Sequence, residues 1–436
     1  SAKNEIQGFN PSWISVGTLF MNSLYNFLRI QLTQWLNTYA SEINYEVILS
    51  SDKVPGEGEH KIINEIRKSV PGRTNYIYGP DGDMLFLTLL LPDPTFIITD
   101  SQATYQCCDI TKLRNYIGGL LTPHWGSEDS YDQRVIRDYV MVCSIFGNDF
   151  LPKLKMVFSL ETAWELVTKT YRENFGKTGE ITLVDESGLP ILGYLKDFFK
   201  ELEKSEVPLL EVQTKVTPID VRFRDYTLES CMVNVDGDPQ LFFDGYREAY
   251  YEREGAPEKM CESYWNTFIW SYQYYLTGKV NWTQAYQYYE APFLCDLLKY
   301  WTVPERVSDD PIPDSFTPFA QLACILPPSM RENLPEEYRN MFNPESREYL
   351  GDQFFPTEFE YDLRGKFSEH QGVVRMPLFD RNAMMKKLAT KKLGAYNRNI
   401  RTTEDRWSTV IGEPQKFTCG KKIIEYTICY EPAKKI

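Results

Sequence analysis

The sequence predicts an α/β protein, with a parallel sheet and its helices in residues 1–165 and a mostly helical, aromatic-rich region in residues 166–436. Short apolar strands alternate with amphipathic helices in the first region, which is typical of parallel sheets. In the second region helical stretches are separated by a polar segment at 176–190 and by proline-rich connections at 304–318 and 327–335. With 436 residues, of which 42% are hydrophobic, the chain can bury a large core.

The elements of the first region follow from hydrophobic periodicity and from the residues that interrupt it. In chain order we expect a helix at 13–40, a strand at 45–49, a helix at 57–68, strands at 75–78 and 95–99, and a helix at 131–146. Pro71 and Gly72 end the helix at 57–68, because neither residue continues a helix well. The strand at 75–78 runs into a glycine-rich acidic loop.

Composition excludes several classes of protein. A net charge of −14 argues against a protein that coats nucleic acid through a basic surface. The negative charge does not argue against a protein that binds nucleic acid through metal ions, since a metal site needs carboxylates. No uncharged apolar run approaches the ~18 residues of a membrane helix. The nine cysteines are scattered and form no CxxC pair, which favours reduced thiols in an intracellular protein; a cytoplasmic location is favoured over a nuclear or virion one.

Three acidic clusters are the candidate catalytic or metal-binding groups: Glu57 with Glu59, Asp81 with Asp83, and Asp149. Each cluster follows a strand or helix at the same predicted edge of the sheet, where ligands bind in open α/β folds. Carboxylates gathered there would repel one another unless divalent cations neutralised them, and oxygen ligands favour Mg²⁺ or Mn²⁺. Two such ions ~3.5–4 Å apart can activate a water and stabilise the leaving oxygen in phosphoryl displacement.

The same residues also have a purely structural interpretation. Glu57 and Glu59 lie near a helix N-terminus, where carboxylates are favoured in any protein. Asp81 and the following Gly82 form a good turn dipeptide. Spacing alone leaves both interpretations open and slightly favours the structural one.

Several motifs, in collinear order over nearly the whole chain, resemble the XRN-type 5′→3′ exoribonuclease family. The most specific is VPGEGEHKI at 54–62, and the others are ISVGTLFM at 14–21, YGPDGD at 78–83, FGNDFLP at 146–152, an aromatic helix and tryptophan loop at 264–293, FTPFAQLACILPP at 316–328 and DLRGK at 362–366. This resemblance implies a PIN/FEN-like nuclease core joined to a second conserved region that walls the active site. It also implies processive, metal-dependent degradation of RNA with a 5′-monophosphate, releasing nucleoside 5′-monophosphates.

Carried over by position, the resemblance makes Glu57, Glu59, Asp81, Asp83 and Asp149 metal ligands, direct or through water. These acids are therefore also the predicted catalytic residues.

Four further residues are candidate substrate contacts. The resemblance places a tryptophan of residues 264–293 on the 5′ nucleotide, and Trp282, in a loop, is preferred over Trp270. Stacking of a base on an aromatic side chain is worth ~1–3 kcal/mol and does not depend on which base is present. His60 and Lys61 lie beside the acids in sequence. For His60 the simpler interpretation is a helix residue hydrogen-bonded to a neighbouring loop, and for Lys61 a solvated helix face is an equal alternative to a phosphate contact.

The resemblance also has departures. The family's core starts far upstream of the motif at 54–62, and that part carries two further metal-binding aspartates, the 5′-phosphate pocket and a stacking histidine. We expect one of three explanations: this upstream part is absent from the chain, another polypeptide supplies it, or the protein has lost it together with nuclease activity. Arg137 and Lys153 also replace an aspartate and a histidine that are usual in the family. The main alternative is therefore an inactive XRN-like scaffold or virion component; a flap-type DNA nuclease leaves residues 264–330 unexplained.

Overall fold

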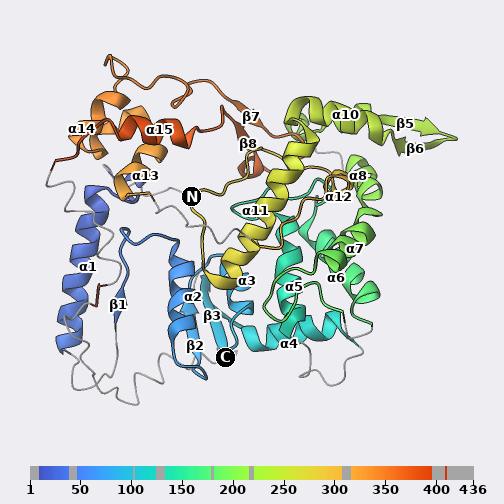
Figure 1. Cartoon of the computed structure of the whole chain (residues 1–436), viewed down its shortest axis with the longest axis horizontal. Coiled ribbons are helices and arrows are strands. Elements are labelled where there is room, and N and C mark those ends of the chain that lie inside the picture. Colours follow the sequence, from blue (N-terminus) through green and yellow to red (C-terminus); the bar gives the residue numbers. More distant parts are fainter. Residues whose placement is uncertain are drawn as a thin grey trace. The chain divides into compact units, whose positions relative to one another are not determined.

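The computed structural model describes residues 9–38, 47–101, 104–123, 133–177, 181–215, 220–306, 316–394 and 408–409 (Figure 1). The chain divides into two compact units. The larger comprises residues 58–313 and 360–375, and the smaller comprises residues 1–57, 314–359 and 376–436. Within the described ranges, no helix is both long and apolar enough to cross a membrane.

The larger unit contains most of the regular structure. Its helices are α2 (Gly58–Lys68), α3 (Asp83–Leu89), α4 (Ile110–Leu121), α5 (Gln133–Cys143), α6 (Leu160–Asn174), α7 (Leu192–Glu203), α8 (Glu206–Lys215), α9 (Tyr226–Ser230), α10 (Phe243–Glu254), α11 (Pro257–Thr277) and α12 (Leu294–Lys299). Its strands are β2 (Asn75–Tyr78), β3 (Thr95–Ser101), β4 (Thr104–Asp109), β5 (Met232–Val235), β6 (Asp238–Leu241), β7 (Glu360–Asp362) and β8 (Val373–Arg375).

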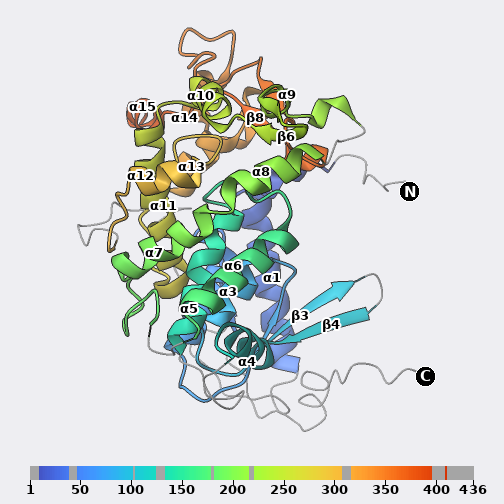
Figure 2. The same cartoon turned by 90° about the vertical axis from the view of Figure 1, so that its right-hand side faces the viewer.

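A three-stranded sheet in the order β2-β3-β4 carries the predicted parallel pair. β2 runs parallel to β3, with Tyr76 opposite Phe96, and both strands were predicted from their apolar runs. β4, which the sequence did not predict, pairs antiparallel with β3, and this β-hairpin projects away from the helices (Figure 2). Ile77 and Ile97 are buried on one face, whereas Tyr78 on the other face is 61% exposed. The expected cover on both faces of the sheet is therefore not found among the described residues.

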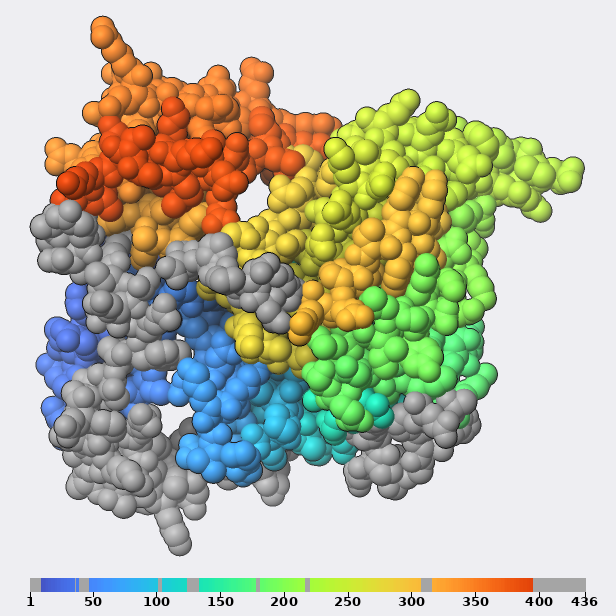
Figure 3. Space-filling model, viewed as in Figure 1, coloured from blue at the N-terminus to red at the C-terminus, as the bar shows by residue number. Residues whose placement is uncertain are grey.

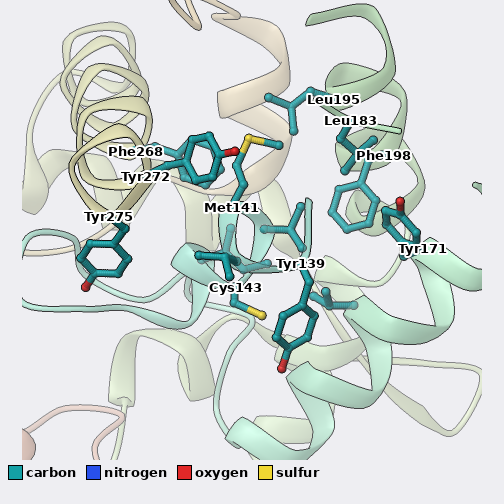
Figure 4. Packing of buried hydrophobic residues seen from close by; sticks show 14 of the residues in the cluster. Tyr139, Met141, Cys143, Tyr171, Leu183, Leu195, Phe198, Phe268, Tyr272 and Tyr275 are labelled. Atoms are coloured by element: carbon teal, nitrogen blue, oxygen red, sulfur yellow. The ribbon is translucent and has the colours of Figure 1, made fainter. Parts of the chain in front are cut away.

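The core of the larger unit is built around α5. Figure 4 shows Met141 of α5 lying between Phe268 and Tyr272 of α11 on one side and Leu195 and Phe198 of α7 on the other. All of these side chains are fully buried. The same core extends from α2 to the segment after α12, so the predicted boundary near residue 165 lies inside this unit.

A buried carboxylate ties α5 to its neighbours. Asp138 has no exposed surface and accepts hydrogen bonds from the Tyr171 hydroxyl (2.6 Å) and from the backbone nitrogens of Leu183 (2.8 Å) and Val184 (2.9 Å). Three donors compensate the desolvation of the charge. Asp138 is therefore a structural acid that joins α5 to α6 and to the segment before α7.

A second cluster of the larger unit packs around Phe293 and includes tyrosines of α10. The β5–β6 hairpin that precedes α10 stands out from the surface of the unit (Figure 3). Asp236 and Gly237 form its turn with φ of 54° and 96°, as a tight hairpin requires.

The short β7–β8 hairpin joins the larger unit through buried ion pairs. Arg375 of β8 bonds to Glu254 of α10 at 2.6 Å and to Asp362 of β7 at 3.0 Å. Asp362 also accepts a bond from Arg253 at 2.9 Å. Glu254 and Asp362 are buried and Arg375 is nearly so, and each of these charges therefore depends on its partners.

The smaller unit has its own core of residues 319–388. Its elements are α1 (Leu19–Thr38), α13 (Pro318–Ile325), α14 (Glu336–Arg339), α15 (Arg381–Leu388), β1 (Ile48–Leu49) and β9 (Ser408–Thr409). The predicted helix at 13–40 is confirmed as α1, yet Phe27 on its predicted apolar face is 58% exposed. The predicted strand at 45–49 is β1, and it pairs with β9 rather than with the β2-β3-β4 sheet.

Candidate active site

The first acid of the site lies in the first turn of α2. Glu59 is partly buried, and burial is the largest cause that raises its pKa. The carboxylates of Asp81, Asp83 and Asp149 raise this pKa further, whereas a backbone hydrogen bond lowers it. Repulsion of this kind requires that the four acids lie near one another. The structure therefore brings together acids that lie up to ninety positions apart.

Asp81 and Asp83 are placed by the turn between β2 and α3. The Asp81 side chain is exposed and accepts a hydrogen bond from the Asp83 backbone nitrogen at 3.0 Å, which fixes the turn. Asp83 opens α3, and the Tyr275 hydroxyl donates to its Oδ2 at 2.6 Å. Burial raises the pKa of Asp83; the Tyr275 hydrogen bond lowers it, and the charges of Asp149 and Asp81 raise it again.

Asp149 is presented by a rigid turn after α5. Gly147 has φ of 89°, a value that favours glycine. The Asn148 side chain accepts hydrogen bonds from the backbone nitrogens of Phe150 and Leu151, each at 2.9 Å. Leu151 is buried and anchors the turn, while Asp149 itself stays exposed.

Helix α11 contacts all three acidic segments. Tyr274 stacks on His60 of α2 with ring centroids 3.7 Å apart and planes 3° apart. Trp270 packs edge-on against Phe150, with centroids 4.8 Å apart. Tyr275 bonds to Asp83 at the start of α3. One face of one helix therefore supports the three loops that carry the acids.

Tyr275 is a site residue that the sequence did not identify. It belongs to the aromatic run of residues 264–293, where aromatic side chains at helical spacing are most simply interpreted as core. Its ring is indeed buried, but its hydroxyl reaches an acid of the site. Nothing in the sequence distinguishes Tyr275, five residues after Trp270, from the neighbouring aromatic residues that belong only to the core.

The predicted substrate contacts differ in exposure. His60 is 2% exposed, and burial followed by the charge of Arg67 lowers its pKa to about 4, although Asp81 acts in the opposite direction. Trp270 is 5% exposed. Both therefore pack inside the unit in this conformation. Lys61 on α2 and Trp282 in the turn after α11 are partly exposed.

Glu57 is the last residue of the smaller unit and immediately precedes α2. It is partly buried and stays a predicted ligand.

The donor set of the acidic loops fits a hard divalent cation, because it consists of carboxylate oxygens. The ranges that the structure describes contain no group of three or more histidine, cysteine or acidic side chains already placed around a metal position. Mg²⁺ does not require such a cage, since proteins usually bind it through one or two carboxylates, waters and substrate phosphates. The residues therefore fit Mg²⁺ or Mn²⁺ bound together with a phosphate ligand.

Comparison with known proteins agrees with these motifs. The family profile described as the XRN 5′-3′ exonuclease N-terminus matches residues 1–102, and the profile described as the Xrn1 helical domain matches residues 130–225 and 234–406.

Curated relatives extend the match over most of the chain. The 5′-3′ exoribonuclease 2 of Arabidopsis thaliana is 25% identical over 550 residues, covering 92% of this chain and 53% of the relative. The 5′-3′ exoribonuclease 1 of Homo sapiens is 24% identical over 462 residues, covering 88% of this chain and 27% of the relative. The chain thus spans between about a quarter and about half the length of these relatives. On the two profile matches, this chain belongs to the XRN 5′-3′ exonuclease family.

Proposed function

We propose that this chain is the catalytic part of a 5′→3′ exoribonuclease that degrades RNA bearing a 5′-monophosphate and releases nucleoside 5′-monophosphates. The observation that carries the proposal is the proximity of Glu59, Asp81, Asp83 and Asp149, whose charges raise the pKa of Glu59. A fold held only for structural purposes gains nothing from such repulsion. The names of the relatives add support, since they are 5′-3′ exoribonucleases.

Each residue has a role in this proposal. Glu57, Glu59, Asp81, Asp83 and Asp149 would hold Mg²⁺ or Mn²⁺, directly or through water. The bound ions would supply a water of lowered pKa and charge stabilisation for the leaving oxygen. Tyr275 would keep Asp83 ionised and oriented, since its hydroxyl donates to that carboxylate.

The terminal base would stack on an aromatic side chain. Trp282 is proposed for this role because it is partly exposed in a turn, whereas Trp270 is packed against Phe150. Stacking suits an enzyme that must accept every base, because all bases present an aromatic face. Lys61, partly exposed on α2, is a candidate contact to the RNA backbone.

Digestion of a 5′-labelled, 5′-monophosphorylated RNA tests this function. We expect Mg²⁺-dependent release of the labelled mononucleotide, and expect Asp81→Asn to lower the rate by at least ~100-fold while RNA binding remains measurable. Asp236→Asn in the projecting β5–β6 hairpin is the matched control and should cut normally. Full activity of Asp81→Asn would refute the assignment of the acids. Inactivity of the unmodified chain, with RNA still bound, would favour an XRN-like scaffold.

A further inference from the structure

A lysine near Asp149 lies in a rigid position beside the acidic turn. Lys153 follows Asp149 by four residues and is partly buried. A Cβ atom at Gly147 would lie 3.0 Å from the Lys153 backbone nitrogen, so the two segments are in close contact. Leu151 and Leu154, on either side, are buried and hold the loop in place. The backbone of Lys153 is therefore fixed relative to the turn that carries Asp149.

Two other lysines lie near Lys153, and each has a carboxylate of its own. Lys155 Nζ lies 3.8 Å from Asp225 Oδ2, and Lys366 Nζ lies 3.0 Å from Glu290 Oε1. Lys153 forms no ion pair with any acid in the part of the chain that the structure describes. Of these three ammonium groups, Lys153 is therefore the one without an ion-pair partner among the described residues.

This environment is unfavourable for a lone ammonium group. Burial lowers the pKa of Lys153, the neighbouring Lys366 and Lys155 lower it further, and Glu290 opposes them, with a result of about 8. An uncompensated, partly desolvated charge is costly, and an anion placed beside it would remove that cost. The charges that act on Lys153 come from these three residues rather than from the site carboxylates.

We propose that Lys153 binds a backbone phosphate of the RNA substrate. The contact rests on the proposed function, because the loop of Lys153 also presents Asp149 to the substrate. The phosphate concerned is a neighbour of the scissile one, because Lys153 lies four residues after Asp149 and is not one of the site acids. Lys153 is then a binding residue that holds the strand in register, and the hydrolysis itself is left to the acids.

The test measures RNA affinity against salt concentration. Binding of a fluorescent 5′-monophosphorylated RNA is followed in EDTA, so that cleavage does not consume it, for the unmodified chain, Lys153→Gln and Lys153→Arg. Loss of one phosphate contact should reduce the slope of log K against log salt by about 0.7 and weaken binding about fourfold at 0.15 M salt. Lys153→Arg should keep both values. Lys200→Gln, on the exposed surface of α7, is the matched control.

The pH dependence gives an independent readout. We expect the affinity of the unmodified chain to fall between pH 7 and pH 9.5 as the Lys153 amine loses its proton, and expect no such fall in Lys153→Arg. An unchanged salt slope in Lys153→Gln would overturn the proposal, as would equal losses in the Gln and Arg variants. Either result leaves RNA digestion, and with it the proposed function, untouched. Failure of the unmodified chain to bind RNA would overturn both.

Discussion

Asp83 receives opposing influences from its surroundings, and its protonation is the clearest property of the site at the scale of single residues. Burial and the charges of Asp149 and Asp81 raise its pKa, while the Tyr275 hydroxyl stabilises the ionised form through a 2.6 Å hydrogen bond. The balance lies on the raised side. Ionised Asp83 therefore depends in part on a single hydroxyl donated by α11.

Tyr275→Phe removes that hydroxyl and keeps the buried ring. We expect the pKa of Asp83 to rise further, because burial and the charges of Asp149 and Asp81 remain, and all of them raise this pKa. If ionised Asp83 is needed for cleavage, the acid limb of the pH profile of kcat/KM should move to higher pH, while activity at high pH stays close to that of the unmodified chain. The profile between pH 5 and pH 9 measures this shift.

Tyr264→Phe is the matched control on the same helix. Tyr264 is fully buried in α11, and its hydroxyl has no hydrogen-bond partner among the described residues. The substitution should leave the pH profile unchanged. Equal profiles for the Tyr275 and Tyr264 variants would mean that Asp83 does not act through its ionised form.

Sequence reasoning could place the acids but not the residues that support them. Asp81 and Asp83 were predictable because they follow a strand in a glycine-rich loop, and in the structure their charges, with that of Asp149, raise the pKa of Glu59. Tyr275 was not predictable, since only the tertiary structure decides which hydroxyl of an aromatic helix meets a carboxylate. Whether the acids hold metal stays a prediction.

At the scale of elements, strands with one strongly apolar face were predictable and exposed ones were not. β2 and β3 were both predicted, because Ile77 and Ile97 belong to apolar runs that end at turn residues. β4 was missed, because residues 104–107 are exposed and show no alternation. β1 was predicted as a strand, but its partner β9 lies about 360 residues away, beyond the reach of any local pattern.

The β7–β8 hairpin depends on charges rather than on a large apolar face. Arg375→Met should destabilise the larger unit by about 3–5 kcal/mol, because it leaves Glu254 and Asp362 buried without this partner. Urea unfolding measures the change.

A surface arginine provides the comparison. Arg222 pairs with Asp220, and their side chains are 57% and 38% exposed. Arg222→Met should therefore leave the urea unfolding midpoint almost unchanged. Similar small costs for both substitutions would show that the β7–β8 network contributes little to stability.

At the scale of the whole molecule, the net charge of −14 includes the repelling acids of the site. Mg²⁺ that binds the folded chain should raise the melting temperature by mass action, and at a concentration 100 times the dissociation constant the gain is about 2.7 kcal/mol. Thermal unfolding with MgCl₂, compared with NaCl at equal ionic strength, measures this effect.

The Asp83→Asn variant makes the same measurement specific to the site. It removes one of the repelling charges, so we expect a higher melting temperature without metal and a smaller response to Mg²⁺. A response to Mg²⁺ equal to that of the unmodified chain would place the bound ion elsewhere.

Helix α11 also limits how this sequence can change in evolution. Trp270, Tyr274 and Tyr275 reach three acidic segments from less than two turns of one helix. Inserting or deleting one residue within that stretch would rotate the later side chains by about 100° relative to the earlier ones. Length changes should therefore be rare there among related sequences and frequent in the projecting β5–β6 hairpin, where no acidic segment depends on the spacing.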